Sequence, residues 1–236
     1  MKKLILLIIL LPIYINAQTV SGIGAMKNDT IAKRILDYAQ LRVYYRLVFE
    51  PDPTAPKIEK EAETLLQIGN KVSRFMDYNE FRLDSLSDYT AKNKLPVLTY
   101  IAEMMNVGKK INYKENIVLS HDDNELTNQQ SIVMSEIYQY KEPIPNMQWT
   151  LLKGDTVISG YNCLKATILF RGRTYVAWYA KDLAIPYGPY KFSNLPGLIF
   201  YLHDTKFQYN FIIDGLKRVK FYDPIYVYTK KDIIST

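Results

Sequence analysis

The sequence predicts a mainly β fold of antiparallel strands with a short helical insert, and three observations carry this prediction. Apolar and polar residues alternate with period two in several segments, as in half-buried strands. Turn-forming Gly, Pro and Asn residues separate these segments closely enough for antiparallel pairing. Only the stretch 79–108 departs from this pattern. An apolar fraction of 48% in 236 residues excludes a disordered chain.

The N-terminal half supplies the first strands and the insert. Segment 35–50 alternates strictly and ends at Pro51-Asp52-Pro53, where a strand ladder cannot continue. Gly69-Asn70 lies between two apolar runs and predicts a hairpin that joins 64–68 to 71–78. Within the insert, apolar residues recur at helical spacing, which predicts a helix over 96–106 that ends near Gly108. Strand patterns resume at 111–120 and at about 130–140.

The C-terminal half is the most regular part of the chain. Alternation predicts that Leu164, Ala166, Ile168 and Phe170 share one face of a strand, and that Thr174, Val176, Trp178 and Ala180 share one face of the next. Further strands are expected at 197–204, 206–215, 217–223 and 225–230. We therefore expect 155–230 to form consecutive hairpins or a meander.

The N-terminal segment 1–17 has the layout of a secretory signal peptide. Lys2 and Lys3 precede an apolar run over 4–11, and Ala17 offers a small residue at the cleavage point before Gln18. The mature chain 18–236 is then a single β-rich domain with an insert at about 79–108. It has no second apolar run long enough to span a membrane. We expect export to the periplasm or envelope, or release.

Charge and composition exclude several classes of partner and cofactor. Removal of Lys2 and Lys3 leaves a net charge of +4, with no basic stripe for nucleic acid. One Cys and two His cannot form a disulfide framework or a Cys-rich metal site. The acidic stretch 121–125 around His121 is better explained as a solvated turn than as a cation site. We therefore expect no cofactor and no metal.

Several separated motifs in the C-terminal half resemble those of a known family. They are the string 158–166 (ISGYNCLKA), Gly172-Arg173, 177–179 (AWY) and the stretch 185–199, which ends in Asn194, Leu195, Pro196, Gly197, Leu198 and Ile199. This order is similar to the GLPGLI family of exported Bacteroidetes proteins. The resemblance is dense from Trp149 to Ile199 and loose over the rest of the mature chain, and Asn194 stands where the family has its first Gly. It implies export, an envelope setting and a β-rich fold, and it supplies no catalytic residue.

A looser resemblance is to the bowl-like N-terminal domain of a bacterial peptide-N-glycosidase. It implies a non-catalytic, curved antiparallel sheet, so the expected fold is a curved antiparallel sheet or partial barrel.

Turn chemistry explains the 194–199 motif, because Pro196-Gly197 favours a tight turn and Asn tolerates positive φ. We expect Asn194 or Gly197 to have positive φ, and we favour a rigid elbow over a ligand-gripping loop.

Two functions from different classes remain. The 20 tyrosines crowd the strands and turns, so a non-catalytic envelope protein could bind a partner protein, a peptide or an apolar ligand on a Tyr-rich sheet. Trp178, Tyr187 and Tyr190 are the candidate binding residues, and no residue is expected to be catalytic. The alternative is a small secreted hydrolase with Cys163 as nucleophile and His203 as base.

Overall fold

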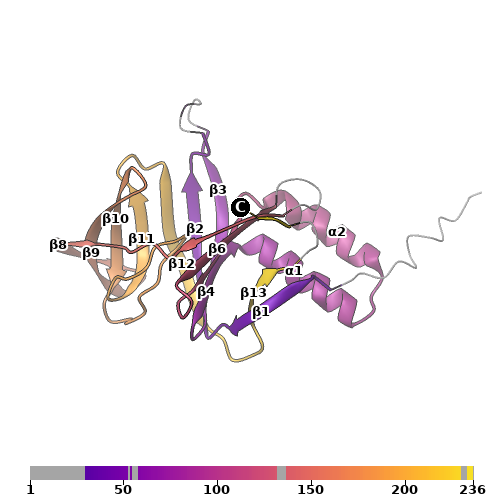
Figure 1. Ribbon diagram of the computed structural model, residues 1–236. Helices are drawn as coiled ribbons and strands as arrows, with labels where there is room; N and C mark the ends of the chain where they lie inside the picture. The colour runs from indigo at the N-terminus through magenta and orange to yellow at the C-terminus, as the bar shows by residue number, and fades with distance from the viewer. Residues whose placement is uncertain (1–29, 53, 55–57, 132–136, 230–232, 236) are drawn as a thin grey trace, which may run out of the picture.

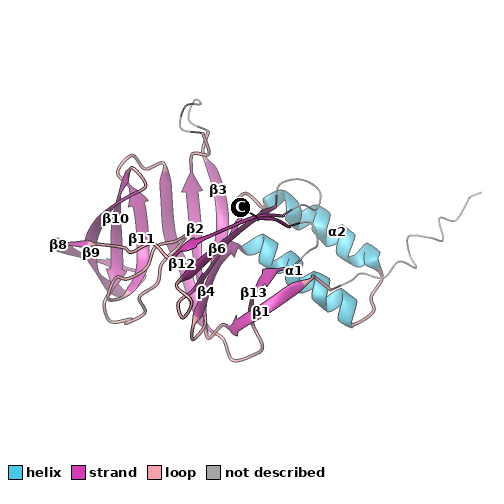
Figure 2. Ribbon diagram, in the orientation of Figure 1, coloured by secondary structure: helices cyan, strands magenta, loops and turns pink. Residues whose placement is uncertain are grey.

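The computed structural model describes residues 30–52, 54, 58–131, 137–229 and 233–235. It is mainly β, with 53% of the described residues in strands, in a large antiparallel sheet that does not close into a barrel. Two helices accompany the sheet, as Figure 2 shows. The predicted fold class is therefore confirmed. The predicted signal peptide lies outside the described residues.

One sheet of twelve strands forms the frame of the molecule (Figure 1). All of its pairings are antiparallel except that of the last strand with β7. In spatial order its strands are β14 (Ile233–Ser235), β7 (Ile137–Pro143), β6 (Glu125–Ser131), β5 (Glu115–Ser120), β4 (Val72–Asp77), β3 (Lys60–Ile68), β2 (Leu41–Phe49), β12 (Tyr209–Arg218), β11 (Leu198–Asp204), β10 (Arg173–Ala180), β9 (Tyr161–Phe170) and β8 (Thr150–Ile158).

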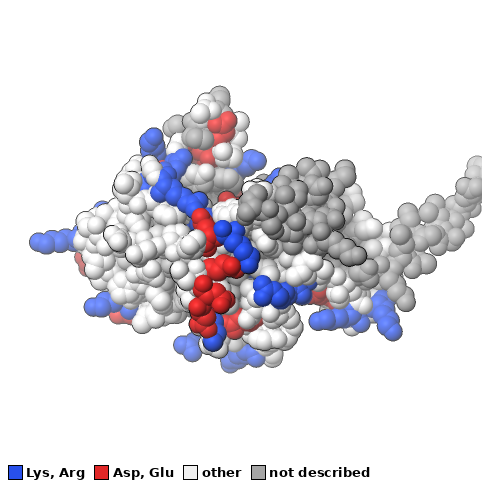
Figure 3. Space-filling model, viewed as in Figure 1, with Lys and Arg blue, Asp and Glu red and all other residues white. Residues whose placement is uncertain are grey.

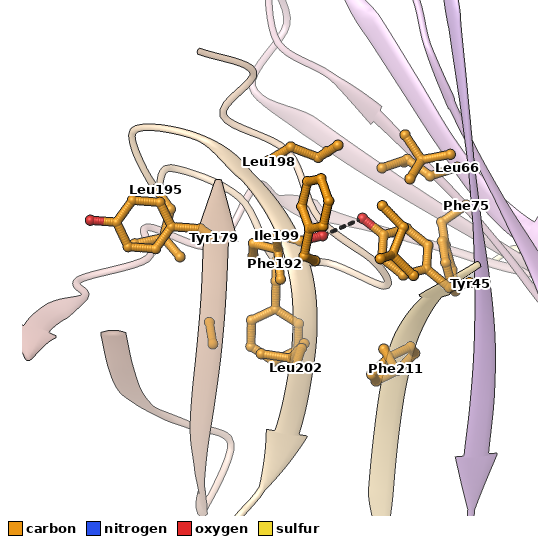
Figure 4. Packing of buried hydrophobic residues seen from close by; sticks show 14 of the residues in the cluster. Tyr45, Leu66, Phe75, Tyr179, Phe192, Leu195, Leu198, Ile199, Leu202 and Phe211 are labelled. Carbon is orange, nitrogen blue, oxygen red and sulfur yellow. Dashed lines mark hydrogen bonds between the residues drawn. The ribbon is translucent and has the colours of Figure 1, made fainter. Parts of the chain in front are cut away.

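The sheet has two halves, one that runs from β14 to β2 and one that runs from β12 to β8. The main core lies on the face of the sheet where these halves meet. Tyr45 of β2 extends toward β11, and its hydroxyl donates a 2.7 Å hydrogen bond to the carbonyl oxygen of Ile199 (Figure 4). Phe75 of β4 and Phe211 of β12 pack edge-to-face beside it. Because both halves supply fully buried side chains to one cluster, burial of apolar surface holds the sheet in its curved shape.

The opposite face of β3, β4 and β5 is covered by a second layer. This layer contains α1 (Tyr78–Lys92), α2 (Val97–Val107) and a two-stranded sheet of β1 (Lys33–Tyr38) with β13 (Pro224–Tyr228) (Figure 1). A short 3-10 turn, Gly108–Lys110, follows α2. Apolar contacts join Phe81 of α1 to Leu65 and Met76 of the sheet. No helix within the described ranges is long and apolar enough to cross a membrane.

Most predicted strands are confirmed, and three details are corrected. The hairpin at Gly69-Asn70 and the meander through β8–β12 are as expected. The insert contains α1 in addition to the helix expected over 96–106. That expected helix is α2, and it begins at Val97 because Pro96 is its N-cap residue. Segment 217–223 is not a separate strand, since β12 continues to Arg218. β13 pairs with β1 and not with the meander.

The predicted grouping of Thr174, Val176, Trp178 and Ala180 on one face of β10 is confirmed only in part, since Ala180, which follows a register shift between Trp178 and Tyr179, is fully buried. Tyr175, Ala177 and Tyr179 are buried in the core, whereas Trp178 is half-buried on the other face. Trp178 lies opposite Tyr201, and Lys165 lies over its ring at 5.4 Å from the centroid. Alternation correctly predicted a strand here, but the aromatic residues on both faces made the choice of the core face ambiguous.

Candidate functional site

The three predicted binding residues do not form one surface. Trp178 of β10 is half-buried and packs against the main core cluster from outside it. Tyr187 packs edge-to-face against His121, with ring centroids 5.2 Å apart. Tyr190 lines a pocket between the two halves of the sheet. The structure therefore does not bring the three residues together, and the pocket that contains Tyr190 is the candidate site.

We call this cavity the tyrosine pocket. Its volume is about 200 Å³, and its wall combines aromatic rings with a few charged groups. Its lining residues come from the start of β5, the β9–β10 hairpin, the loop before β11 and the start of β12. They are Tyr113, Glu115, Phe170, Arg171, Arg173, Tyr175, Tyr190, Tyr209 and Phe211. Concave sites with aromatic walls and a small number of convergent polar groups are typical of ligand binding.

The two arginines of the tyrosine pocket already have acidic partners. Arg171 donates two hydrogen bonds to Glu142, at 2.8 and 2.7 Å. Arg173 donates to Asp204 at 3.1 Å and to Gln208 at 2.6 Å. Glu115 accepts a 2.7 Å bond from the Asn128 amide. The charges are therefore held in place, and the pocket carries no large excess of one sign.

A buried lysine fixes the loop that carries Tyr190. The side chain of Lys191 is fully buried, and its Nζ donates to the Tyr140 hydroxyl at 2.7 Å and to Glu142 at 2.8 Å. The same Nζ lies 5.4 Å from the ring centroid of Tyr190. Tyr190 has φ of 59°, a conformation that costs a non-glycine residue free energy and persists only where the surroundings impose it. Lys191 is thus the anchor that positions Tyr190.

The hydroxyl of Tyr113 has no hydrogen-bond partner among the described residues, although it is buried. The residue is only 8% exposed. Asp77 holds the backbone here, since its Oδ2 accepts from the amides of Asn112 and Tyr113 at 3.1 Å each. Burial raises the pKa of Tyr113 and Tyr190, and it raises the pKa of Tyr175 to about 12. All three hydroxyls are therefore protonated, and able to donate, at neutral pH.

The motif 194–199 forms the end of the loop that leads into β11. Asn194 has φ of 70°, which confirms the prediction for this residue. The φ of Gly197 is not positive, so of the two residues named in the prediction only Asn194 confirms it. The role of Gly197 is close approach instead, because a Cβ there would lie 2.2 Å from the Ala180 carbonyl oxygen. Leu198 and Ile199 are fully buried, as an elbow into a core strand requires.

The structure separates the two residues of the alternative hydrolase. Cys163 pairs across the sheet with Ala180 of β10, whereas His203 of β11 pairs with Val176. Val176 and Ala180 are four steps apart along β10, which is about 13 Å. Cys163 is fully buried, and burial raises its pKa, so the reactive thiolate is disfavoured. His203 stacks on Phe207 with ring centroids 4.5 Å apart.

The acidic stretch around His121 does not converge on one point. Asp122 pairs with Lys71, Asp123 accepts from Ser120, and Glu125 pairs with Lys141. In the described part of the chain, no group of three or more His, Cys, Asp or Glu side chains could hold a metal ion. On the face of the molecule that Figure 3 shows, acidic and basic side chains are mixed in one band.

A buried ionic cluster between α1 and the sheet was not predicted. The side chain of Arg74 is fully buried, and its guanidinium lies 3.9 Å from the ring centroid of Tyr226 and 3.7 Å from Asp84. Asp84 accepts hydrogen bonds from the hydroxyls of Tyr226 and Tyr228, at 2.5 and 2.6 Å. Burial and the neighbouring Asp84 raise the pKa of Glu80 to about 8. These contacts attach α1 to the sheet, which is a structural role.

A larger hollow of about 590 Å³ lies between α1 and α2. Its walls are mostly the apolar and small residues of the two helices. Arg82 and Glu103 form an ion pair there, and both side chains are about 40% exposed. It lacks the buried, converging polar groups of the tyrosine pocket, so we regard the tyrosine pocket as the candidate site.

No protein-family model matches the chain, and no curated protein sequence matches it. Among solved structures, two crystal forms of PNGF-II, a peptide-N-glycosidase, have a similar fold. One has a TM-score of 0.52 at 15% identity over 84% of this chain, and the other 0.50 at 16% over 78%. The chain spans 31% and 28% of those proteins' lengths. The expected similarity to a peptide-N-glycosidase is thus shown at the level of fold.

Proposed function

We propose that the protein is a non-catalytic binding protein of the bacterial cell envelope and a member of the GLPGLI family. Membership is supported by the order of motifs from residue 158 to Ile199. Asn194, the departure from the family's glycine, adopts the positive φ that glycine would adopt without strain. Export is supported by the order of basic, apolar and small residues in segment 1–17.

The tyrosine pocket is the observation that carries the binding function. It gathers residues from four distant segments of the chain around one cavity. Its charged groups are held by partners outside the cavity, and Tyr190 is held in a strained conformation by the loop around Lys191. Strain that the surroundings impose is commonly found at ligand-binding sites. A partner protein, a peptide or a small ligand would insert a single ring-sized group here.

The arrangement supports binding more than catalysis. The thiol of Cys163 is buried with a raised pKa, and His203 lies on a different part of the sheet. A nucleophile and its base must lie within hydrogen-bond reach of one another, or be joined by one water. The alternative hydrolase therefore lacks its geometry.

The Tyr190→Gly variant tests this function. Glycine accepts positive φ and removes the ring from the pocket wall, so the fold should be preserved. Mature wild-type and variant proteins would each be used to capture partners from envelope extract, with Tyr222→Ala as the control because Tyr222 is 65% exposed and outside the pocket. We expect a partner that Tyr222→Ala retains and Tyr190→Gly loses.

Two results would contradict the proposal. One is equal capture of the same partners by wild type and Tyr190→Gly. The other is turnover of peptide, ester or glycan substrates that Cys163→Ser abolishes. Fractionation of cells with an antibody to the protein tests the location, since cytoplasmic protein that retains residues 1–17 would oppose export.

A further inference from the structure

We propose that the tyrosine pocket binds one neutral sugar ring. This inference rests on the proposed binding function and names the class of ligand for the same site. It follows from four properties of the pocket: its aromatic walls, its polar groups, its balance of charge and its size.

The walls offer flat apolar faces. Phe170 of β9 and Tyr209 and Phe211 of β12 line the same cavity. Tyr209 stacks on Phe49 with ring centroids 6.2 Å apart, so its ring is supported from outside the pocket. A pyranose ring has one face made mainly of C–H groups, and such a face packs well on aromatic rings.

The polar groups of the wall differ in whether they donate or accept hydrogen bonds. Glu115 only accepts hydrogen bonds, Arg173 only donates, and Tyr113 can do both. A sugar hydroxyl is both donor and acceptor, so one ring can serve all three kinds of group. The buried hydroxyl of Tyr113 has no partner among the described residues, and a polar group left in this state costs free energy. A ligand that supplies this partner would remove the cost.

The balance of charge favours a neutral ligand. Arg171 and Arg173 have their own carboxylates, Glu142 and Asp204. An anionic ligand would approach Glu115, and a cationic ligand would approach both arginines. A neutral ring avoids both repulsions and still hydrogen-bonds with charged groups, which gives stronger bonds than neutral pairs do.

The size limits the ligand to a single ring. A cavity of about 200 Å³ corresponds to roughly seven water molecules at ~30 Å³ each. An aromatic side chain would also fill this volume, but it carries at most one polar atom. It would leave either Tyr113 or Glu115 without a new partner, so the sugar ring satisfies the site better.

The experiment measures binding of defined probes by saturation-transfer NMR and by titration of the full mature protein. The probes are the methyl glycosides of glucose, galactose, mannose and N-acetylglucosamine, with p-cresol as an aromatic ring that has one hydroxyl. We expect at least one glycoside to bind with a millimolar dissociation constant, as suits a ligand of so few atoms, and more tightly than p-cresol.

Variants locate the binding in the pocket. Tyr113→Phe removes only the unpartnered hydroxyl, and Glu115→Gln removes a charge at constant shape. We expect each to weaken glycoside binding at least tenfold, whereas Tyr222→Phe, outside the pocket, should bind like wild type. The melting temperature of Tyr113→Phe should equal or exceed that of wild type, since the unpartnered hydroxyl stabilises nothing in the free protein.

Three results would overturn the sugar assignment. They are binding of p-cresol but of no glycoside, glycoside binding that both pocket variants leave unchanged, and failure of every probe to bind. The first leaves the proposed function standing, because it shows an apolar ligand in the pocket. After the third, capture by wild type against Tyr190→Gly still decides the proposed function independently.

Discussion

The buried pair Lys191–Glu142 should respond very differently to removal of its two ends. The Lys191 side chain is fully buried, whereas that of Glu142 is 27% exposed and is also held by Arg171. Glu142→Gln leaves the buried ammonium of Lys191 without its carboxylate, which costs about 3–5 kcal/mol. Lys191→Met leaves Glu142 with a cationic partner and access to water, so it should cost only about 1–2 kcal/mol.

Urea unfolding at pH 7 measures both free energies, and the double variant completes the cycle. We expect Lys191→Met/Glu142→Gln to be more stable than Glu142→Gln alone, because the buried charge is gone. Lowering the pH should act in the same direction as Glu142→Gln. Burial opposes ionisation of Glu142, but the bonds and charges of Lys191 and Arg171 outweigh it and lower its pKa. The stabilisation that ionised Glu142 provides is therefore fully present above its ordinary pKa of 4.5. It is lost as pH falls through the lowered pKa. Equal losses from the two single variants would refute the reasoning.

Four other changes have expected outcomes. Gly197→Ala should destabilise by about 3 kcal/mol or more, because the new Cβ would collide with the Ala180 backbone, and failure of the variant to lower the melting temperature would oppose this. Asn194→Ala should cost about 1 kcal/mol in urea unfolding while Asn194→Gly is neutral or stabilising, since φ is 70° there. The folded protein keeps a proton on Glu80 up to a pKa of about 8, whereas the unfolded chain loses it near 4.5. Stability should therefore fall as pH rises between these values, by at most about 1.4 kcal/mol per pH unit, and Glu80→Gln should flatten that slope. Trp178→Ala should cost about 1–2 kcal/mol, less than a core tryptophan, and a loss above about 3 kcal/mol would place its ring in the core.

The second layer shows where sequence reasoning failed and why. Helix α1 was missed because the residues that it buries include Asn79, Asp84, Ser87 and Thr90, so no apolar stripe marks its inner face. The sheet surface beneath it combines the apolar Leu65 and Met76 with the fully buried, charged Arg74. One signal was available: Asp77 caps the helix by accepting from the Asn79 amide at 2.8 Å, and Glu80 follows at the third position after Asp77.

The positions of strands along the sequence were easier to predict than the pairing between strands. Alternation identified β2, β9 and β10, because each has one face more buried than the other. It did not predict that β13 leaves the meander to pair with β1, since pairing depends on positions far apart in sequence. The tyrosine pocket was hidden for the same reason. Of its lining residues only Tyr190 was predicted to bind a ligand, and Tyr113 and Glu115 carry no local motif that predicts their convergence with it.

The pairing of β12 with β2 has a consequence for the order of folding. Tyr209 lies opposite Phe49, so strands from the two ends of the chain are neighbours at the centre of the sheet. The hairpins on either side are local and can form early, but closing so long a loop delays this last pairing and slows folding. Until then β2 has an open edge and its core residues Val43, Tyr45 and Leu47 are exposed. We therefore expect a chain truncated before β12 to aggregate, and the complete chain to need protection from self-association until its C-terminal third is available.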